Sequence, residues 1–303
     1  QVLTASADAT AKLWNTATRE EIRTFEGHTS WVYEAVFSPD GTRVATASAD
    51  CSTRIWDVAT GEVFRILQAD KAPQGASKEL VDSTVPPGLD KKTAGQPKGP
   101  LDCFVRAVAF SPDGTQILTG AFRTVRLWDI ESAEIIRVFG DANPLVTSVA
   151  FSPDGTLALT GSQYEESAVK LYDVATGQEV RVFDTEGLYG FESVAFSPDG
   201  TAILVGGYTG GTNLWDIATG DILRCFGGFY YSAAAVAFSA NGREVLTGGS
   251  SAGGNWQSVT SLWDISDLFP PEGEGEGEGE GLGIPCDENP DGCPHPTGGI
   301  YVV

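Results

Sequence analysis

The feature that most constrains this sequence is a short motif that returns along most of its length. The pentapeptide FSPDG begins at Phe37, Phe110, Phe151 and Phe196, and the variant FSANG begins at Phe238. A second motif, an aliphatic residue followed by an aromatic residue and aspartate, comes roughly twenty residues after each copy. A motif with a fixed period indicates that one structural unit recurs along the chain.

The aromatic residue of the second motif gives the period. These residues are Trp14, Trp56, Trp128, Tyr172, Trp215 and Trp263, spaced 42, 72, 44, 43 and 48 residues apart. Only the second interval departs from the period, and its extra residues lie in 69–100, which is rich in Lys, Pro, Gly and Ala. This composition predicts an inserted surface loop, either without function of its own or serving as an arm that binds a partner.

Each unit predicts four antiparallel strands. In the second unit the runs WVYEAVFS, TRVATAS, STRIWDV and EVFRILQ alternate with turn signals. SPDG makes a tight reversal, because Pro suits the second turn position, Asp bonds locally and Gly accepts a positive φ. Residues such as Val36, Ile55 and Phe64 put apolar groups on both faces of the sheet, so each sheet needs a neighbour on both sides. A ring of such sheets is a β-propeller, and the predicted fold class is all-β.

With its Trp-Asp motifs and SPDG turns, the chain resembles the WD-repeat (WD40) β-propeller family over residues 1–268. The resemblance implies six recognisable blades of four-stranded sheet, the first and last of them incomplete. Counting strands gives 22, two fewer than six full blades require. We expect that about 20 residues, or those plus a seventh blade, precede Gln1. The rival hypothesis is that the terminal run 300–303 fills one gap.

The resemblance also implies a hydrogen-bonded chain in the second blade. In the family, a His before the first strand, a Ser or Thr on the second, an Asp in the following turn and the Trp are linked. His28, Ser48, Asp50 and Trp56 match these positions. The other blades depart from this pattern, so they are expected to depend more on packing.

Charge and composition disfavour several classes of function. Lys and Arg number 19 against 41 Asp and Glu, a formal charge of −22, so the chain repels phosphate backbones and nucleic acid is not an expected partner. His28 and His295 are the only histidines, which leaves little for a catalytic triad or a multi-histidine metal site. No apolar stretch approaches the roughly 20 residues of a spanning helix, so no membrane insertion is expected.

The sequence therefore predicts a noncatalytic scaffold without a cofactor that binds protein or peptide partners. Loops carry specificity on such folds, and aligning the units brings contact-prone residues to one rim. The candidates are Trp31, Tyr33, Phe104, Arg106, Arg123, Tyr164, Tyr208 and Tyr230. For each aromatic residue, packing between blades is the alternative interpretation. The alternative function is a subunit of a homopolymer or filament joined by strand donation from the tail. This alternative predicts self-association.

The C-terminal part differs from the repeats. Residues 269–283 form an acidic Glu-Gly linker, and 284–303 form a tail with a Cys-bounded segment. Three chemistries fit that segment: a disulfide between Cys286 and Cys293, a Ca²⁺ site using Asp287, Asn289 and Asp291, or zinc held by the two cysteines with His295. Pro290 and the absence of a glutamate at the twelfth loop position weaken the calcium interpretation.

The remaining cysteines are Cys51, Cys103 and Cys225, which the sequence predicts to be buried or half-buried free thiols. The tail alone favours an oxidising environment, so a secreted or cell-surface location is favoured without excluding the cytoplasm.

Overall fold

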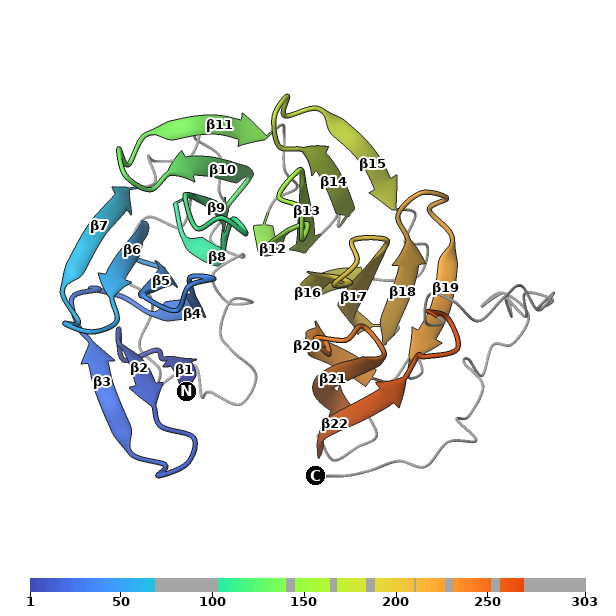
Figure 1. Ribbon diagram of the computed structural model, residues 1–303, viewed down its shortest axis with the longest axis horizontal. Helices are drawn as coiled ribbons and strands as arrows, with labels where there is room; N and C mark the ends of the chain where they lie inside the picture. Colours follow the sequence, from blue (N-terminus) through green and yellow to red (C-terminus); the bar gives the residue numbers. More distant parts are fainter. Residues whose placement is uncertain are drawn as a thin grey trace.

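The computed structural model describes residues 1–68, 103–139, 145–163, 168–183, 189–209, 211–226, 231–251 and 257–269. Every regular element in these residues is a β-strand, and the 22 strands form six antiparallel sheets. The sheets follow one another around a common axis as the blades of a propeller (Figure 1). The predicted all-β class, the six blades and the count of 22 strands are all confirmed.

The strands follow the chain from blade to blade. The first two blades contain β1 (Val2–Ala5), β2 (Ala11–Trp14) and β3 (Glu21–Phe25), then β4 (Val32–Phe37), β5 (Arg43–Ser48), β6 (Ser52–Asp57) and β7 (Val63–Gln68). The next two contain β8 (Val105–Phe110), β9 (Gln116–Ala121), β10 (Thr124–Asp129) and β11 (Ile135–Phe139), then β12 (Leu145–Phe151), β13 (Leu157–Gln163), β14 (Val169–Asp173) and β15 (Glu179–Phe183). The last two contain β16 (Tyr189–Phe196), β17 (Ala202–Thr209), β18 (Thr212–Asp216) and β19 (Ile222–Phe226), then β20 (Tyr231–Phe238), β21 (Glu244–Ser251) and β22 (Gln257–Asp264).

The first and last blades have three strands each, whereas the four between them have four. In the first blade, β1 pairs Val2 with Trp14 as β5 pairs Val44 with Trp56, so β1 corresponds to the second strand of a complete blade. In the last blade, β22 carries Trp263 and corresponds to the third strand. Figure 1 shows these two blades on either side of an opening in the ring.

An apolar contact that repeats around the ring holds each blade to the next. On the second blade, Ile55 pairs with Ala45 across two strands, and both side chains are fully buried. They pack in one cluster with Val108 and Trp128 of the third blade. Burying an aliphatic side chain of this size contributes about 1.5–3 kcal/mol, so these contacts are a major source of stability.

The SPDG turns are fixed by their aspartates. Asp40 Oδ1 accepts hydrogen bonds from Ser38 Oγ at 2.6 Å and from the Thr42 backbone N–H at 3.0 Å. The hydrogen bond from Ser38, with those from Thr42, lowers the pKa of Asp40 to about 2. In the variant FSANG, Asn241 Oδ1 accepts the corresponding bonds from Ser239 and Arg243, so the substitution keeps the turn.

Arginines on the outer strands tie each blade to the turn of the following blade. Arg23 donates to the backbone oxygens of Val58, Ala59 and Thr60 in the second blade. The corresponding residues that also donate to backbone oxygens of the following blade are Arg65, Arg137, Arg181 and Arg224. These bonds align neighbouring blades at their outer edge.

The indole N–H of most repeat tryptophans bonds a threonine on the second strand. Trp14, Trp56, Trp128 and Trp263 donate to Thr4, Thr46, Thr119 and Thr247 at 2.8–3.0 Å. The fifth blade has Val205 at this position, two residues after Ile203, the cross-strand partner of Trp215. Trp215 Nε1 is buried there without a hydrogen-bond partner in the described residues.

We therefore expect Val205→Thr to raise the free energy of unfolding by about 1 kcal/mol, because it gives the Trp215 N–H an acceptor. The reciprocal change, Thr119→Val, should lower it by roughly 1–3 kcal/mol, because it leaves the Trp128 N–H buried and unpaired. Denaturant titration of both variants measures the two shifts. A loss of stability in Val205→Thr as large as that in Thr119→Val would contradict this account.

Candidate functional site at the inner rim

Five inner strands carry a β-bulge at corresponding positions, which places one extra residue in each. The register skips Tyr33 in β4, Arg106 in β8, Thr147 in β12, Glu192 in β16 and Ala234 in β20. A bulge turns the side chain of its extra residue away from the regular alternation of the strand. We call these five residues the bulge ring, and the end of the blades where they lie the inner rim.

Two members of the bulge ring form an ion pair. Arg106 Nη2 lies 3.2 Å from Glu192 Oε2, although the fourth blade stands between their strands in the chain. Gln163 Nε2 also donates to Glu192. Burial raises the pKa of the Glu192 carboxyl, and Arg106 and Gln163 oppose this rise.

The guanidinium of Arg106 retains unused donors. Its Nη1 is buried and donates no hydrogen bond within the described ranges. The same group lies 5.8 Å from the ring centroid of Tyr33, in cation–π geometry. The site therefore combines a cation with spare donors, an aromatic face and a carboxylate.

Next to the bulge ring, side chains of one blade bond the backbone of the next. Glu34 Oε2 accepts from the Val108 N–H at 2.7 Å, and Ser148 and Ser193 accept from Val194 and Val236 in the same way. Glu34 is half-buried as a residue, but its carboxylate is enclosed, and this burial raises its pKa to about 7. Glu34 thus joins the second and third blades.

This raised pKa predicts a pH dependence of stability. The folded protein holds the Glu34 proton to about pH 7, whereas an ordinary glutamate loses it near 4.5, so stability falls between these values and stays lower above them. The unfolding free energy of wild type minus that of Glu34→Gln should fall by roughly 1–3 kcal/mol from pH 4.5 to 8. Denaturant titration across this range measures it; a difference that does not change with pH would contradict the assignment.

The candidate aromatic residues at this rim are mostly buried. Trp31 and Phe104 are 5% and 4% exposed and pack with Ala49 in one cluster, against which Tyr33 also packs. The rings of Trp31 and Tyr33 meet edge to face at 6.3 Å. The structure thus brings Trp31, Tyr33, Phe104 and Arg106 together, as the alignment of units predicts. Trp31 and Phe104 are the buried members of this group.

The hydrogen-bonded chain of the second blade is present, with one change of member. His28 Nδ1 lies 2.8 Å from Asp50 Oδ2, and His28 Nε2 lies 2.6 Å from Thr46 Oγ1, which also accepts from Trp56 Nε1. Burial raises the pKa of Asp50, but the hydrogen bonds from His28 and Ser52 outweigh it and hold this pKa well below its usual range.

Thr46, and not the predicted Ser48, is the hydroxyl of this chain. Trp56 pairs with Val44, so its indole reaches the next residue on the same strand face, and Ser48 lies about 7 Å further along. Ser48 instead donates to the Ser30 carbonyl and accepts from the Asp50 N–H.

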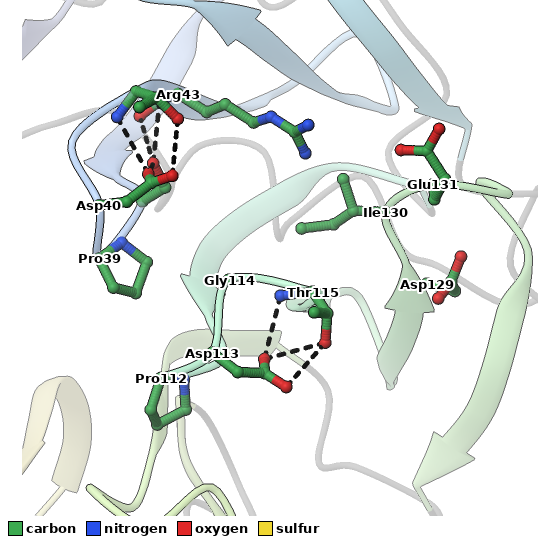
Figure 2. A pocket seen from close by; sticks show the side chains of 12 residues that line it. Pro39, Asp40, Arg43, Pro112, Asp113, Gly114, Thr115, Asp129, Ile130 and Glu131 are labelled. Atoms are coloured by element: carbon green, nitrogen blue, oxygen red, sulfur yellow. Dashed lines mark hydrogen bonds between the residues drawn. The ribbon is translucent and has the colours of Figure 1, made fainter.

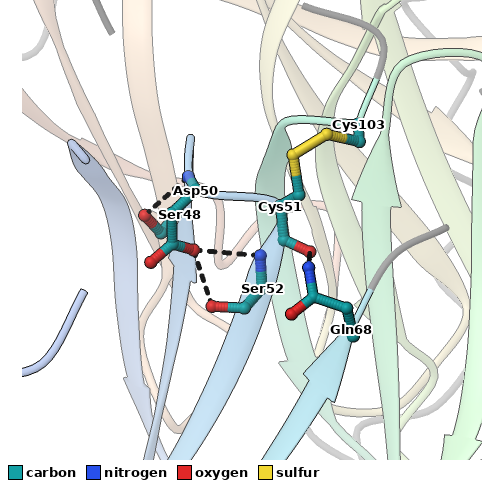
Figure 3. The surroundings of a disulfide bond; sticks show 6 residues. All are labelled: Ser48, Asp50, Cys51, Ser52, Gln68 and Cys103. Atoms are coloured by element: carbon teal, nitrogen blue, oxygen red, sulfur yellow. Dashed lines mark hydrogen bonds between the residues drawn. A yellow bond between two sulfur atoms is a disulfide. The ribbon is translucent and has the colours of Figure 1, made fainter. Parts of the chain in front are cut away.

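A disulfide joins the second and third blades at this rim. Cys51, in the turn between β5 and β6, is bonded to Cys103, just before β8, with the Cα atoms 5.0 Å apart. Gln68 Nε2, at the end of β7, donates to the Cys51 carbonyl (Figure 3). The expectation that these cysteines are free thiols is wrong, and Cys225 is not a free thiol either.

The disulfide closes a loop of 52 residues, so we expect Cys51→Ala with Cys103→Ala to destabilise the protein by about 4 kcal/mol in the chain-entropy model. Thermal melting of the double variant against wild type, both unreduced, measures the loss. Equal melting temperatures would contradict a stabilising role.

The opposite end of the blades bears a cleft of about 470 Å³ between the second and third blades (Figure 2). Asp40, Asp113 and Asp129 line it. Each of these carboxylates already accepts hydrogen bonds inside its own turn. The acidic lining is therefore explained by the turns, and the inner rim is the better candidate site.

Several predicted residues cannot be placed in the site. Arg123 is exposed, with a φ of 57°, and lies over the Phe122 ring at 5.7 Å. Tyr208 lies in β17, but its side chain is not described. The linker 269–283 lies outside the described residues from position 270 onward. The remaining candidates also lie outside them and stay predictions: Tyr164, Tyr230, Cys286, Asp287, Asn289, Asp291, Cys293 and His295.

Membrane-spanning helices and clusters of metal ligands are both absent from the described residues. None of the segments described forms a helix with the length and apolar character that crossing a bilayer demands. Among the same residues, no three His, Cys, Asp or Glu side chains gather as metal ligands would. Calcium in the C-terminal tail stays a prediction.

Comparison with known families agrees with this architecture. Residues 19–57, 94–129, 133–173 and 178–216 match the family described as WD domain, G-beta repeat. These segments together make up just over half of the chain, which therefore belongs to the WD40 family. Propellers of this family generally serve as noncatalytic scaffolds for protein interactions. No curated protein matches the chain.

Proposed function

We propose that this protein is a noncatalytic WD40 scaffold that binds a protein or peptide partner at the inner rim. One observation carries the proposal: the strands and turns of the blades repeat, whereas the residue at the bulge position differs from blade to blade. Corresponding inner-strand bulges present Tyr33, Arg106, Thr147, Glu192 and Ala234. Side chains that differ on a repeated rigid frame are suited to recognition, because the repeat itself does not dictate them. Thr147 is the exception, since it is 7% exposed and donates to the backbone oxygens of Gly161 and Phe191.

The chemistry of the rim favours a partner with a hydrogen-bond acceptor. Arg106 Nη1 has no acceptor among the described residues, and the Glu192 oxygens are taken up by Arg106 and Gln163. The Arg106 side chain is 19% exposed although Nη1 itself is buried. A peptide carbonyl or carboxylate that meets the guanidinium after a small rotation would complete its hydrogen bonds in a partly desolvated place, where such bonds are strong.

The disulfide beside the rim supports a secreted or cell-surface location. Disulfides persist in oxidising compartments and are rare where thiols are kept reduced. Cys51 and Cys103 are also 5% and 2% exposed, which protects the bond from exchange.

The test is selection of peptides on the intact protein from a displayed random library. Binding of the selected peptides is then measured to wild type and to Arg106→Gln combined with Glu192→Gln. The double variant removes both charges together, so no buried charge is left unpaired. We expect binding to weaken at least about tenfold, the loss of one charge-assisted hydrogen bond.

The matched control is Val180→Ser on the outer strand β15, where the side chain is 54% exposed and far from the bulge ring in the blade. It should leave binding unchanged. Selected peptides that bind the rim variant as tightly as wild type, or that lose affinity to the control, would place the partner site elsewhere.

A second candidate function is a homopolymer joined by strand donation from the tail. The free edges of β1 and β22 in the described sheets favour it, because such edges accept an added strand. Native mass measurement separates the two functions: discrete monomers at micromolar concentration contradict the polymer, and a ladder of oligomers supports it.

A further inference from the structure

Cys225, on the outer strand β19, forms a disulfide with a cysteine other than Cys51 or Cys103. The chain has five cysteines, and Cys51 and Cys103 are bonded to each other. Within one chain, the partner of Cys225 is therefore Cys286 or Cys293, both in the C-terminal tail. Otherwise the partner is a cysteine of a second copy.

The face of β19 that carries Cys225 is less exposed than the same face of other outer strands. Leu223 and Cys225 lie on this face, because alternate residues of a strand point the same way, and both are half-buried. The corresponding residues of β11 and β15 are 43–54% exposed: Ile136, Val138, Val180 and Val182. β19 is also the last strand of its sheet, on the outside of the fifth blade (Figure 1). Its outer side is thus a place where a further segment of chain can pack.

The C-terminal tail leaves the described fold beside the same strand. Arg224, next to Cys225 in β19, forms an ion pair with Asp267. Phe269, the last described residue, packs against the apolar cluster that Leu223 also contacts. These two contacts hold the start of the tail at the fifth blade, where Cys225 lies.

The chain between Phe269 and the tail cysteines is long enough to return to β19. Residues 270–285 precede Cys286 and are rich in glycine. A flexible glycine-rich segment of this length has a root-mean-square end-to-end distance of about 20–24 Å. Groups joined by such a segment meet at an effective concentration of order millimolar, which exceeds that of a second copy in micromolar solution. A cysteine of the same chain is therefore the favoured partner.

We infer that the C-terminal tail docks on the outer side of β19 and is fastened there by a disulfide between Cys225 and one tail cysteine, Cys286 or Cys293. Two successive exchange steps oxidise the two thiols to this bond and reduce a disulfide oxidant to two thiols. The bond closes a loop that contains β20, β21 and β22, the whole of the last blade. It therefore clasps the last blade to the fifth.

The clasp restricts what else the tail can do. Once one tail cysteine is bonded to Cys225, Cys286 and Cys293 cannot be bonded to each other, and the other tail cysteine remains as a thiol. A tail fastened to its own blade also cannot be donated to a neighbouring copy. The inference does not depend on the rim function, because β19 and the inner strands lie at opposite edges of their sheets.

Peptide mapping of the unreduced protein tests the bond. The intact chain is equilibrated with glutathione disulfide, alkylated and digested with trypsin, which cuts after Arg224 and Arg243 and at no later position. We expect peptide 225–243 joined to peptide 244–303, from a chain that has the mass of a monomer without reductant. Further cleavage after Glu288 separates Cys286 from Cys293 and identifies the partner. Cys225 that is alkylated or bound to glutathione, or a disulfide-linked dimer, overturns the inference.

Thermal melting tests the clasp. Cys225→Ser should lower the melting temperature by roughly 5–10 °C, because the long loop is no longer closed. Cys286→Ser with Cys293→Ser should cause the same loss without altering β19. The matched control is Val182→Ser at the corresponding position of β15, which is 48% exposed and should leave the temperature unchanged.

The outcomes separate this inference from the rim function. If the tail double variant melts like wild type, the clasp is overturned, because a loss in Cys225→Ser alone then reflects packing within β19. Peptides selected on the rim should bind Cys225→Ser as tightly as wild type. Failure of rim binding therefore leaves the mapped disulfide standing, and absence of the disulfide leaves rim binding standing.

Discussion

Small sheets that are apolar on both faces cannot be stable in water alone, and the rest of this structure depends on that constraint. Burial of each blade requires a neighbour on either side, so the sheets must stack around an axis. The polar bonds between blades follow the same contacts: the outer-strand arginines bind the carbonyls of the next blade, and Glu34 binds the Val108 N–H. Packing and hydrogen bonds together thus fix how each blade is aligned with the next.

The same repetition creates the setting for recognition. Positions that pack between blades are restricted to apolar residues, but the extra residue of each inner-strand bulge is not restricted in this way. At these positions Arg106 contacts both Tyr33 and Glu192, which come from other blades and are distant in sequence. The disulfide between Cys51 and Cys103 lies beside them and fixes the second blade to the third.

Local sequence patterns were sufficient to predict most of the features that form within one repeat. The SPDG turns, the strand count and the tryptophan positions follow from residues close in sequence, and all are seen. Assigning Ser48 to the hydrogen-bonded chain was wrong, because the choice between residues 46 and 48 depends on which one lies diagonal to Trp56 across the strand pair. That register is set by pairing geometry, which spacing along one strand does not reveal.

The amino-acid order alone therefore specified the kind of unit and how often it recurs, since turn residues and alternating apolar groups act over a few positions. The pairing of Cys51 with Cys103 and the bulges that aim Arg106 at Glu192 emerged only when the blades were placed around their axis. Each of these depends on distances between residues far apart in the chain, and such distances exist only after neighbouring sheets have packed.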